Sequence, residues 1–155
     1  SAAIFGVWGS TSTMATVAPR RSSSRAVALP IPPVPPVMST TFSQVQKALG
    51  PERNAVRMVS ISIDPEHDTP EALKIYAKRY GAGPQWQMLT GSLDNSIAVQ
   101  RAFNVYRGDK MGHTPATFLR ARAGQPWVRL DGFASADDIL REYRKLTATK
   151  LTATN

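Results

Sequence analysis

The stretch VRMVSISIDPEHDTPEALKIYAKRYG, residues 56–81, decides the fold of this chain. β-Branched residues occupy every second position from Val59 to Ile63, which is the period of a strand, and Pro65 ends the run. A helix is predicted a few residues later. A strand that leads into a helix through a short polar turn is half of a βαβ unit, which buries both elements against a sheet. The stretch therefore predicts an α/β protein.

The two ends of the predicted helix are marked by specific residues. Thr69 is placed to cap the helix, Pro70 to occupy its first position and Gly81 to end it. Four apolar residues between these ends recur at helical spacing and form one stripe: Leu73, Tyr76, Ala77 and Tyr80. We expect this stripe to pack against the sheet.

Helices and strands continue to alternate in the rest of the globular sequence. Before the central strand and helix we expect a helix through Phe42, Val45 and Leu49, and after them a short strand over 86–89. Next we expect a helix capped by Ser92, whose inward residues are Val99, Ala102, Phe103 and Tyr106. A hairpin of 117–120 with 127–130 follows, and the last helix begins at Ser135 with Ile139, Leu140, Tyr143 and Leu146 inward. This order predicts a central sheet covered by helices on both faces and closed by a C-terminal ββα unit.

Composition limits the classes of function. The chain has 155 residues and a net charge of +8, from 19 basic and 11 acidic residues. The basic residues are scattered, so we expect no nucleic-acid-binding surface. No apolar run is long enough to cross a bilayer. The chain has no cysteine, which excludes disulfides, thiolate metal sites and cysteine nucleophiles.

Residues 1–36 differ in composition from the rest of the chain. They contain no acidic residue and six of the 12 prolines. We therefore expect a loosely attached or disordered Pro/Ser/Arg-rich segment over 1–36, a folded domain over 37–146 and a frayed tail over 147–155. The first strand of the sheet would then be missing or degraded, with residues 26–29 as a candidate remnant. The central strand would keep an unpaired edge.

Five segments of the sequence match one known family. They are PVMSTTF at 36–42, SISIDPEHDTPEAL at 60–73, LTGS at 89–92, AFNVY at 102–106 and GHTPATFL at 112–119. Together they resemble the SCO/SenC family of thioredoxin-fold copper chaperones for cytochrome c oxidase assembly. The resemblance covers about residues 36–146. It implies a thioredoxin-like α/β fold, with a central sheet and helices on both of its faces.

The resemblance implies copper as cofactor, at a site that this chain carries only in part. The family binds copper through a Cys-x-x-x-Cys-Pro motif and one downstream histidine. Pro36 matches the proline and His113 matches the histidine, but the two cysteines would fall at Ile31 and Pro35. His113 is therefore the one matching metal ligand. We expect weak or absent copper binding, because imidazole cannot replace two soft thiolates for Cu(I).

Two interpretations of the missing cysteines remain open. In the first, the protein has lost its thiols and keeps the fold for binding. In the second, residues 1–36 are a misread, such as a frame slip in GC-rich coding sequence, which yields Pro, Arg and Ser. The abrupt change at Pro36 favours the misread.

Other candidate ligands have simpler structural interpretations. Met111 lies two residues before His113 and could share its face, but methionine also packs well in irregular gaps. His67 is expected at the surface of the DPEHDTP turn. Asp64 and Asp68 could be an acid/base or metal pair, but carboxylates that satisfy backbone N–H groups in a turn explain them more simply.

The resemblance implies a SCO/SenC-type copper chaperone or thiol-redox protein in a form that lacks the copper-binding cysteines. Its partner would be the cytochrome c oxidase subunit that carries the binuclear copper site. Its location would be the periplasm or the periplasmic face of the membrane, with any membrane anchor outside this chain. We expect no enzymatic redox activity, because the attacking species in thiol–disulfide exchange is a thiolate. The alternative function is a non-catalytic thioredoxin-fold binding module.

Overall fold

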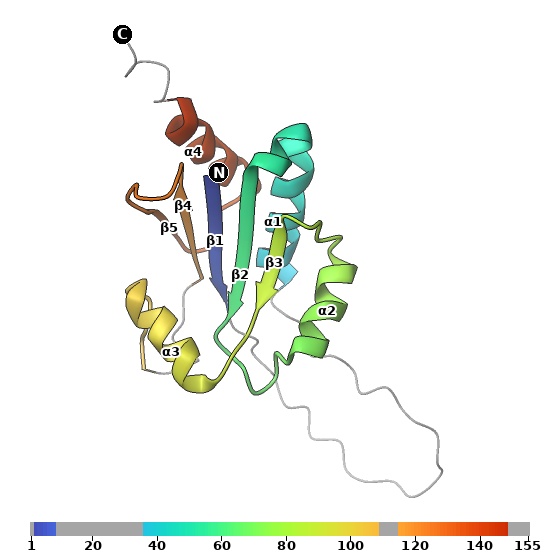
Figure 1. Ribbon diagram of the computed structural model, residues 1–155, viewed down its shortest axis with the longest axis vertical. Helices are drawn as coiled ribbons and strands as arrows, with labels where there is room; N and C mark the ends of the chain where they lie inside the picture. The colour runs from blue at the N-terminus through green and yellow to red at the C-terminus, as the bar shows by residue number, and fades with distance from the viewer. Residues whose placement is uncertain (1, 9–35, 109–114, 149–155) are drawn as a thin grey trace, which may run out of the picture.

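The computed structural model describes residues 2–8, 36–108 and 115–148 of the chain. A five-stranded sheet lies at the centre, with the strand order β3-β2-β1-β4-β5 (Figure 1). Three strands are parallel: β1 (Ala2–Trp8), β2 (Val56–Ser62) and β3 (Trp86–Leu89). Strand β4 (Ala116–Arg120) is antiparallel to both β1 and β5 (Val128–Asp131), which confirms the predicted C-terminal hairpin.

The expectation that the first strand is missing is wrong. Strand β1 (Ala2–Trp8) occupies the middle of the sheet, between β2 and β4. The interpretation of residues 1–36 as loosely attached therefore fails for Ala2–Trp8, and β2 has no unpaired edge. A strand buried at the centre of a sheet reads as a short apolar run without alternation, which periodicity alone cannot assign. The candidate remnant at 26–29 lies outside the described residues.

The stretch at 56–81 folds as predicted. Strand β2 (Val56–Ser62) is followed by α2 (Pro70–Arg79), and Thr69 Oγ1 accepts a hydrogen bond of 3.2 Å from the backbone N–H of Ala72. Gly81 has a φ of 64°, in the left-handed region that favours glycine, and follows the end of the helix.

Helices cover both faces of the sheet (Figure 1). Helix α1 (Pro36–Leu49), which leads into the 3₁₀ segment η1 (Gly50–Ala55), and helix α4 (Ala136–Ala148) pack on one face. Helix α3 (Leu93–Ala102) and the residues after it pack on the other, against Ile63 and Phe118. Helix α2 packs beside β3. The main core, on the α1 face, includes Phe42, Val45, Met58, Trp86, Leu119, Ile139 and Leu140.

Close packing of α1 on the sheet requires a glycine in β1. Gly6 pairs with Ser60 on one side and with Thr117 on the other. A Cβ at this position would lie 2.9 Å from Cζ of Phe42, whose side chain is 1% exposed. The absence of a side chain at Gly6 therefore sets how closely α1 approaches the central strand.

Two helices differ in part from the prediction. In α3 the buried residues are Ser96 and Gln100, while Ala102, expected inward, is exposed. Helix α4 begins with the predicted capping box, in which Ser135 Oγ accepts a hydrogen bond of 3.1 Å from the backbone N–H of Asp138. The helix continues to Ala148, so the frayed tail expected from residue 147 is wrong for its first two residues.

Candidate functional site

The carboxyl ends of the parallel strands form one edge of the sheet, which faces the amino ends of α2 and α3 (Figure 1). Trp8, at the end of β1, pairs with Ser62, at the end of β2. Val7 pairs with Ala116, where β4 begins. Ligand sites in open α/β sheets lie outside the carboxyl ends of the strands, so a functional site is expected at this edge.

A turn over residues 63–69 lies at this edge and is held by internal hydrogen bonds. The backbone N–H of Asp68 donates to the carbonyl oxygen of Asp64 at 2.9 Å. The backbone N–H of Asp64 donates to Ser62 Oγ at 3.0 Å, and the Ser62 hydroxyl donates to Asp68 Oδ2. One serine side chain therefore joins the end of β2 to both ends of the turn.

Asp68 is fully buried at the base of the turn. Its Oδ1 has no hydrogen-bond partner among the described residues. Burial raises the pKa of the Asp68 carboxyl; the Ser62 hydrogen bond opposes this shift, the Asp64 charge adds to it and His67 opposes it. The predicted backbone-capping role of Asp68 is wrong, because its carboxylate accepts from a side-chain hydroxyl and Thr69 caps α2.

Three potential metal ligands gather around the same turn. Ligand atoms of Asp64, Glu66 and His67 all lie within 4.8 Å of one another. His67 Nδ1 is 3.0 Å from Asp64 Oδ2, with the histidine side chain 45% exposed and the aspartate side chain 5% exposed. The predicted surface position of His67 is confirmed. Its contact with Asp64 was missed, although their spacing of three residues within a tight turn could have indicated it.

A chain of buried polar groups connects the turn to α3. The Ser96 hydroxyl donates to the carbonyl oxygen of Ser62 at 3.5 Å, and Gln100 Nε2 donates to Ser96 Oγ at 3.2 Å. Sequence reasoning missed both residues, because polar side chains four apart in a helix usually mark its solvent face. The network ties α3 to the end of β2.

The structure does not test the metal ligand that the resemblance implies. His113 and Met111 lie outside the described residues. The donors described at the carboxyl edge are two carboxylates and one imidazole, whereas Cu(I) prefers soft sulfur ligands. The sequence has no cysteine. The described residues therefore do not fit the copper site that the resemblance implies.

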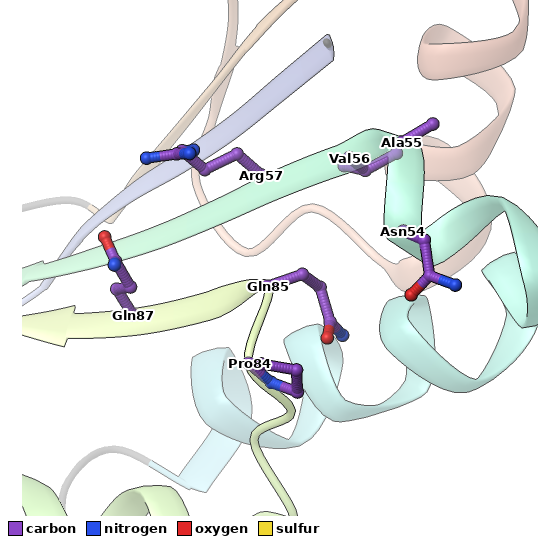
Figure 2. Close-up of a pocket in the computed structure, with 7 residues that line it drawn as sticks. All are labelled: Asn54, Ala55, Val56, Arg57, Pro84, Gln85 and Gln87. Atoms are coloured by element: carbon purple, nitrogen blue, oxygen red, sulfur yellow. The ribbon is translucent and has the colours of Figure 1, made fainter.

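A small pocket lies at the opposite end of the sheet, where β2 and β3 begin (Figure 2). Its volume is about 180 Å³, and it is lined by Asn54, Ala55, Val56, Arg57, Pro84, Gln85 and Gln87. The amide of Gln85 already donates to Gln46 Oε1 at 2.7 Å. Arg57 is the one charged residue of the lining, and a guanidinium does not lose its proton in proteins. The pocket therefore lacks a group for acid–base chemistry.

The strand order, the mixed strand directions and the helices on both faces define a thioredoxin-like α/β protein. The SCO1/SenC family model matches residues 31–148. The chain belongs to the SCO1/SenC family. Among the described residues, no helix combines the length and apolarity needed to span a membrane.

Individual relatives agree with this assignment. The SCO1 protein homolog of Bacillus subtilis is 38% identical over 126 residues, which cover 74% of this chain and 65% of the relative. The chain therefore spans just under two thirds of that relative. BsSco, a member of the Sco family of cytochrome c oxidase assembly proteins with a disulfide switch, has a TM-score of 0.63 at 22% identity, over 95% of this chain and 80% of its own. Arabidopsis thaliana ScoI with copper bound has a TM-score of 0.64 at 17% identity, over 96% and 84%.

Proposed function

We propose that this protein is a SCO/SenC-type assembly factor for cytochrome c oxidase that acts by binding and not by thiol chemistry. The observation that carries the proposal is the family match over residues 31–148 in a chain without cysteine. The role in oxidase assembly is taken from BsSco and extended to this chain as part of the proposal. No enzymatic redox activity is proposed, because thiol–disulfide exchange requires a thiolate.

The proposed partner is the oxidase subunit that carries the binuclear copper site. The proposed location is the periplasm or the periplasmic face of the membrane. Both follow from the family resemblance. The test is co-purification of the full chain with the soluble copper-binding domain of that subunit. We expect the two proteins to form a complex. Absence of binding would contradict the oxidase proposal and favour the alternative, a non-catalytic binding module for another partner.

Tight binding of copper is not part of the proposal. Arabidopsis thaliana ScoI has been solved with copper bound, but this chain lacks both family cysteines. The test is a competition titration with a Cu(I) chelator, for the chain and its His113→Ala variant. We expect the chelator to retain Cu(I) against both. Tight stoichiometric binding that the substitution abolishes would show that His113 has further ligands, and tight binding that survives it would show a different copper site.

The loss of the thiols is itself testable at the level of the gene. If residues 9–35 are a misread, the nucleotides upstream of the Pro36 codon will encode Cys-x-x-x-Cys-Pro in another frame. If no frame does so, the misread interpretation is wrong and the thiol-free binding protein is the better explanation.

A further inference from the structure

The turn over residues 63–69 carries donor groups that the proposed function does not use. Asp64, Glu66 and His67 come from four consecutive residues, and their ligand atoms already lie within 4.8 Å of one another. The backbone hydrogen bonds that His67 and Asp68 donate to the Asp64 carbonyl oxygen, at 3.2 and 2.9 Å, fix the turn. Little ordering of the chain would therefore be needed to bring these donors onto one ion.

A buried carboxyl group lies behind this cluster. The buried carboxyl of Asp68 lies next to the Asp64 backbone, because Ser62 Oγ contacts both groups. Its Oδ1 is buried and has no hydrogen-bond partner among the described residues. Three carboxyl groups thus share one small region with a single imidazole. A cation bound at the turn would therefore have a further carboxyl group, with one unpartnered oxygen, behind its ligands.

We propose that Asp64, Glu66 and His67 form a binding site for a divalent transition-metal ion of the Zn(II) type. Imidazole with carboxylates suits such borderline ions, whereas Cu(I) requires softer donors. The 3.0 Å contact between His67 Nδ1 and Asp64 Oδ2 keeps two of the three donor groups together before an ion arrives. The proposal is independent of the proposed function, because it uses none of the residues that match the family's copper ligands.

The test is calorimetric titration of the metal-free full chain with Zn(II), with matched substitutions at the two histidines. We expect one Zn(II) per chain. His67→Ala and Glu66→Gln should each weaken binding at least tenfold, the lower end of the cost of losing a group that orients a metal ligand. His113→Ala should bind as the unsubstituted chain does. Lack of Zn(II) binding, binding that survives His67→Ala, or binding lost in His113→Ala would each overturn the proposal.

A second measurement separates loss of the site from loss of the fold. Glu66 is exposed, so Glu66→Gln should change the unfolding temperature in a metal chelator little, whereas His67→Ala removes the contact to the buried Asp64 carboxyl and should lower it. Excess Zn(II) should raise the unfolding temperature of the unsubstituted chain and of His113→Ala, because an ion that binds the folded state stabilises it. The same increase in His67→Ala would contradict the proposed ligands.

Discussion

Ser62 connects three parts of the structure through one residue. Its hydroxyl accepts from the backbone of Asp64 and donates to the carboxyl of Asp68, and its carbonyl oxygen accepts from Ser96. The residue is 1% exposed, so these links form away from solvent, where an unsatisfied polar group costs most. The Asp68 carboxyl is part of this buried network, so the stability of the sheet edge at the carboxyl ends of the strands should depend on whether Asp68 is ionised.

Substitution of Asp68 by Asn should flatten the dependence of stability on pH. The folded-state pKa of Asp68 is raised above its ordinary value of 3.8, chiefly by burial. The stability that the neutral form contributes is present below that value and is lost as the pH rises through the raised pKa, by at most about 1.4 kcal/mol per pH unit. Asn cannot ionise. Urea unfolding of both chains in a metal chelator, from acid to neutral pH, should show the smaller decline in Asp68→Asn, and parallel curves would contradict this assignment.

Substitution of Gly6 by Ala should destabilise the fold by about 1–3 kcal/mol, the usual cost of overpacking a core. The added Cβ would lie 2.9 Å from the buried ring of Phe42. Gly91→Ala is a matched control, because a Cβ there would make an ordinary contact of 3.6 Å with Asn95. Urea unfolding midpoints measure both. Equal effects of the two substitutions would show that the close approach of α1 is not what Gly6 provides.

At the scale of elements, α3 differs most from its sequence pattern, because polar residues expected on its solvent-exposed face are buried. Ser96 and Gln100 are both buried, and the helix meets the sheet through hydrogen bonds as well as through its partly buried apolar residues, Val99 among them. A buried polar face of this kind fixes the position of the helix on the sheet, because its polar groups find hydrogen-bond partners in only a few arrangements.

The docking of α3 can be tested with a double-mutant cycle. Ser96→Ala removes the acceptor of Gln100 Nε2 and should cost about 1–3 kcal/mol, the penalty for a buried unsatisfied group. Gln100→Met in the same chain removes that donor and should recover most of the loss. The free energy of unfolding in urea gives both values. If the double variant loses as much free energy of unfolding as the two single variants lose together, the two side chains do not interact.

The elements that could be predicted are those with local signals. Strand β2 alternates, Thr69 and Ser135 cap their helices, and the hairpin of β4 and β5 surrounds a glycine turn. Strand β1 has no such signal, because both of its neighbours in the sheet come from distant parts of the chain. At the site, carboxylates and His67 could be located on the turn, but their mutual contacts and the burial of Asp68 depend on tertiary structure.

At the scale of the whole molecule, β1 holds the two halves of the sheet together. It pairs with β2 on one side and β4 on the other, and these are the pairings that join β3-β2 to β4-β5. Isolated two-stranded pieces are marginally stable at best.

Deletion of residues 2–8 should therefore abolish cooperative unfolding of the whole chain. Thermal unfolding followed by circular dichroism measures this. Addition of a synthetic peptide that carries AAIFGVW should restore a transition whose midpoint rises with peptide concentration. A truncated chain that unfolds cooperatively without the peptide would show that β1 is dispensable.

The central position of β1 also determines when the molecule can fold. Phe5 pairs with Val59 and with Phe118, so the middle row of the sheet joins residues from opposite ends of the sequence. Contacts between distant residues form slowly, because a long loop must close before they contribute any stability. During synthesis, the apolar strand β1 leaves the ribosome well before β4 has been made, so it cannot yet form its pairing with β4. The sheet is completed only after nearly the whole domain has left the ribosome. Until then the unpaired apolar strand β1 is exposed to chaperone binding.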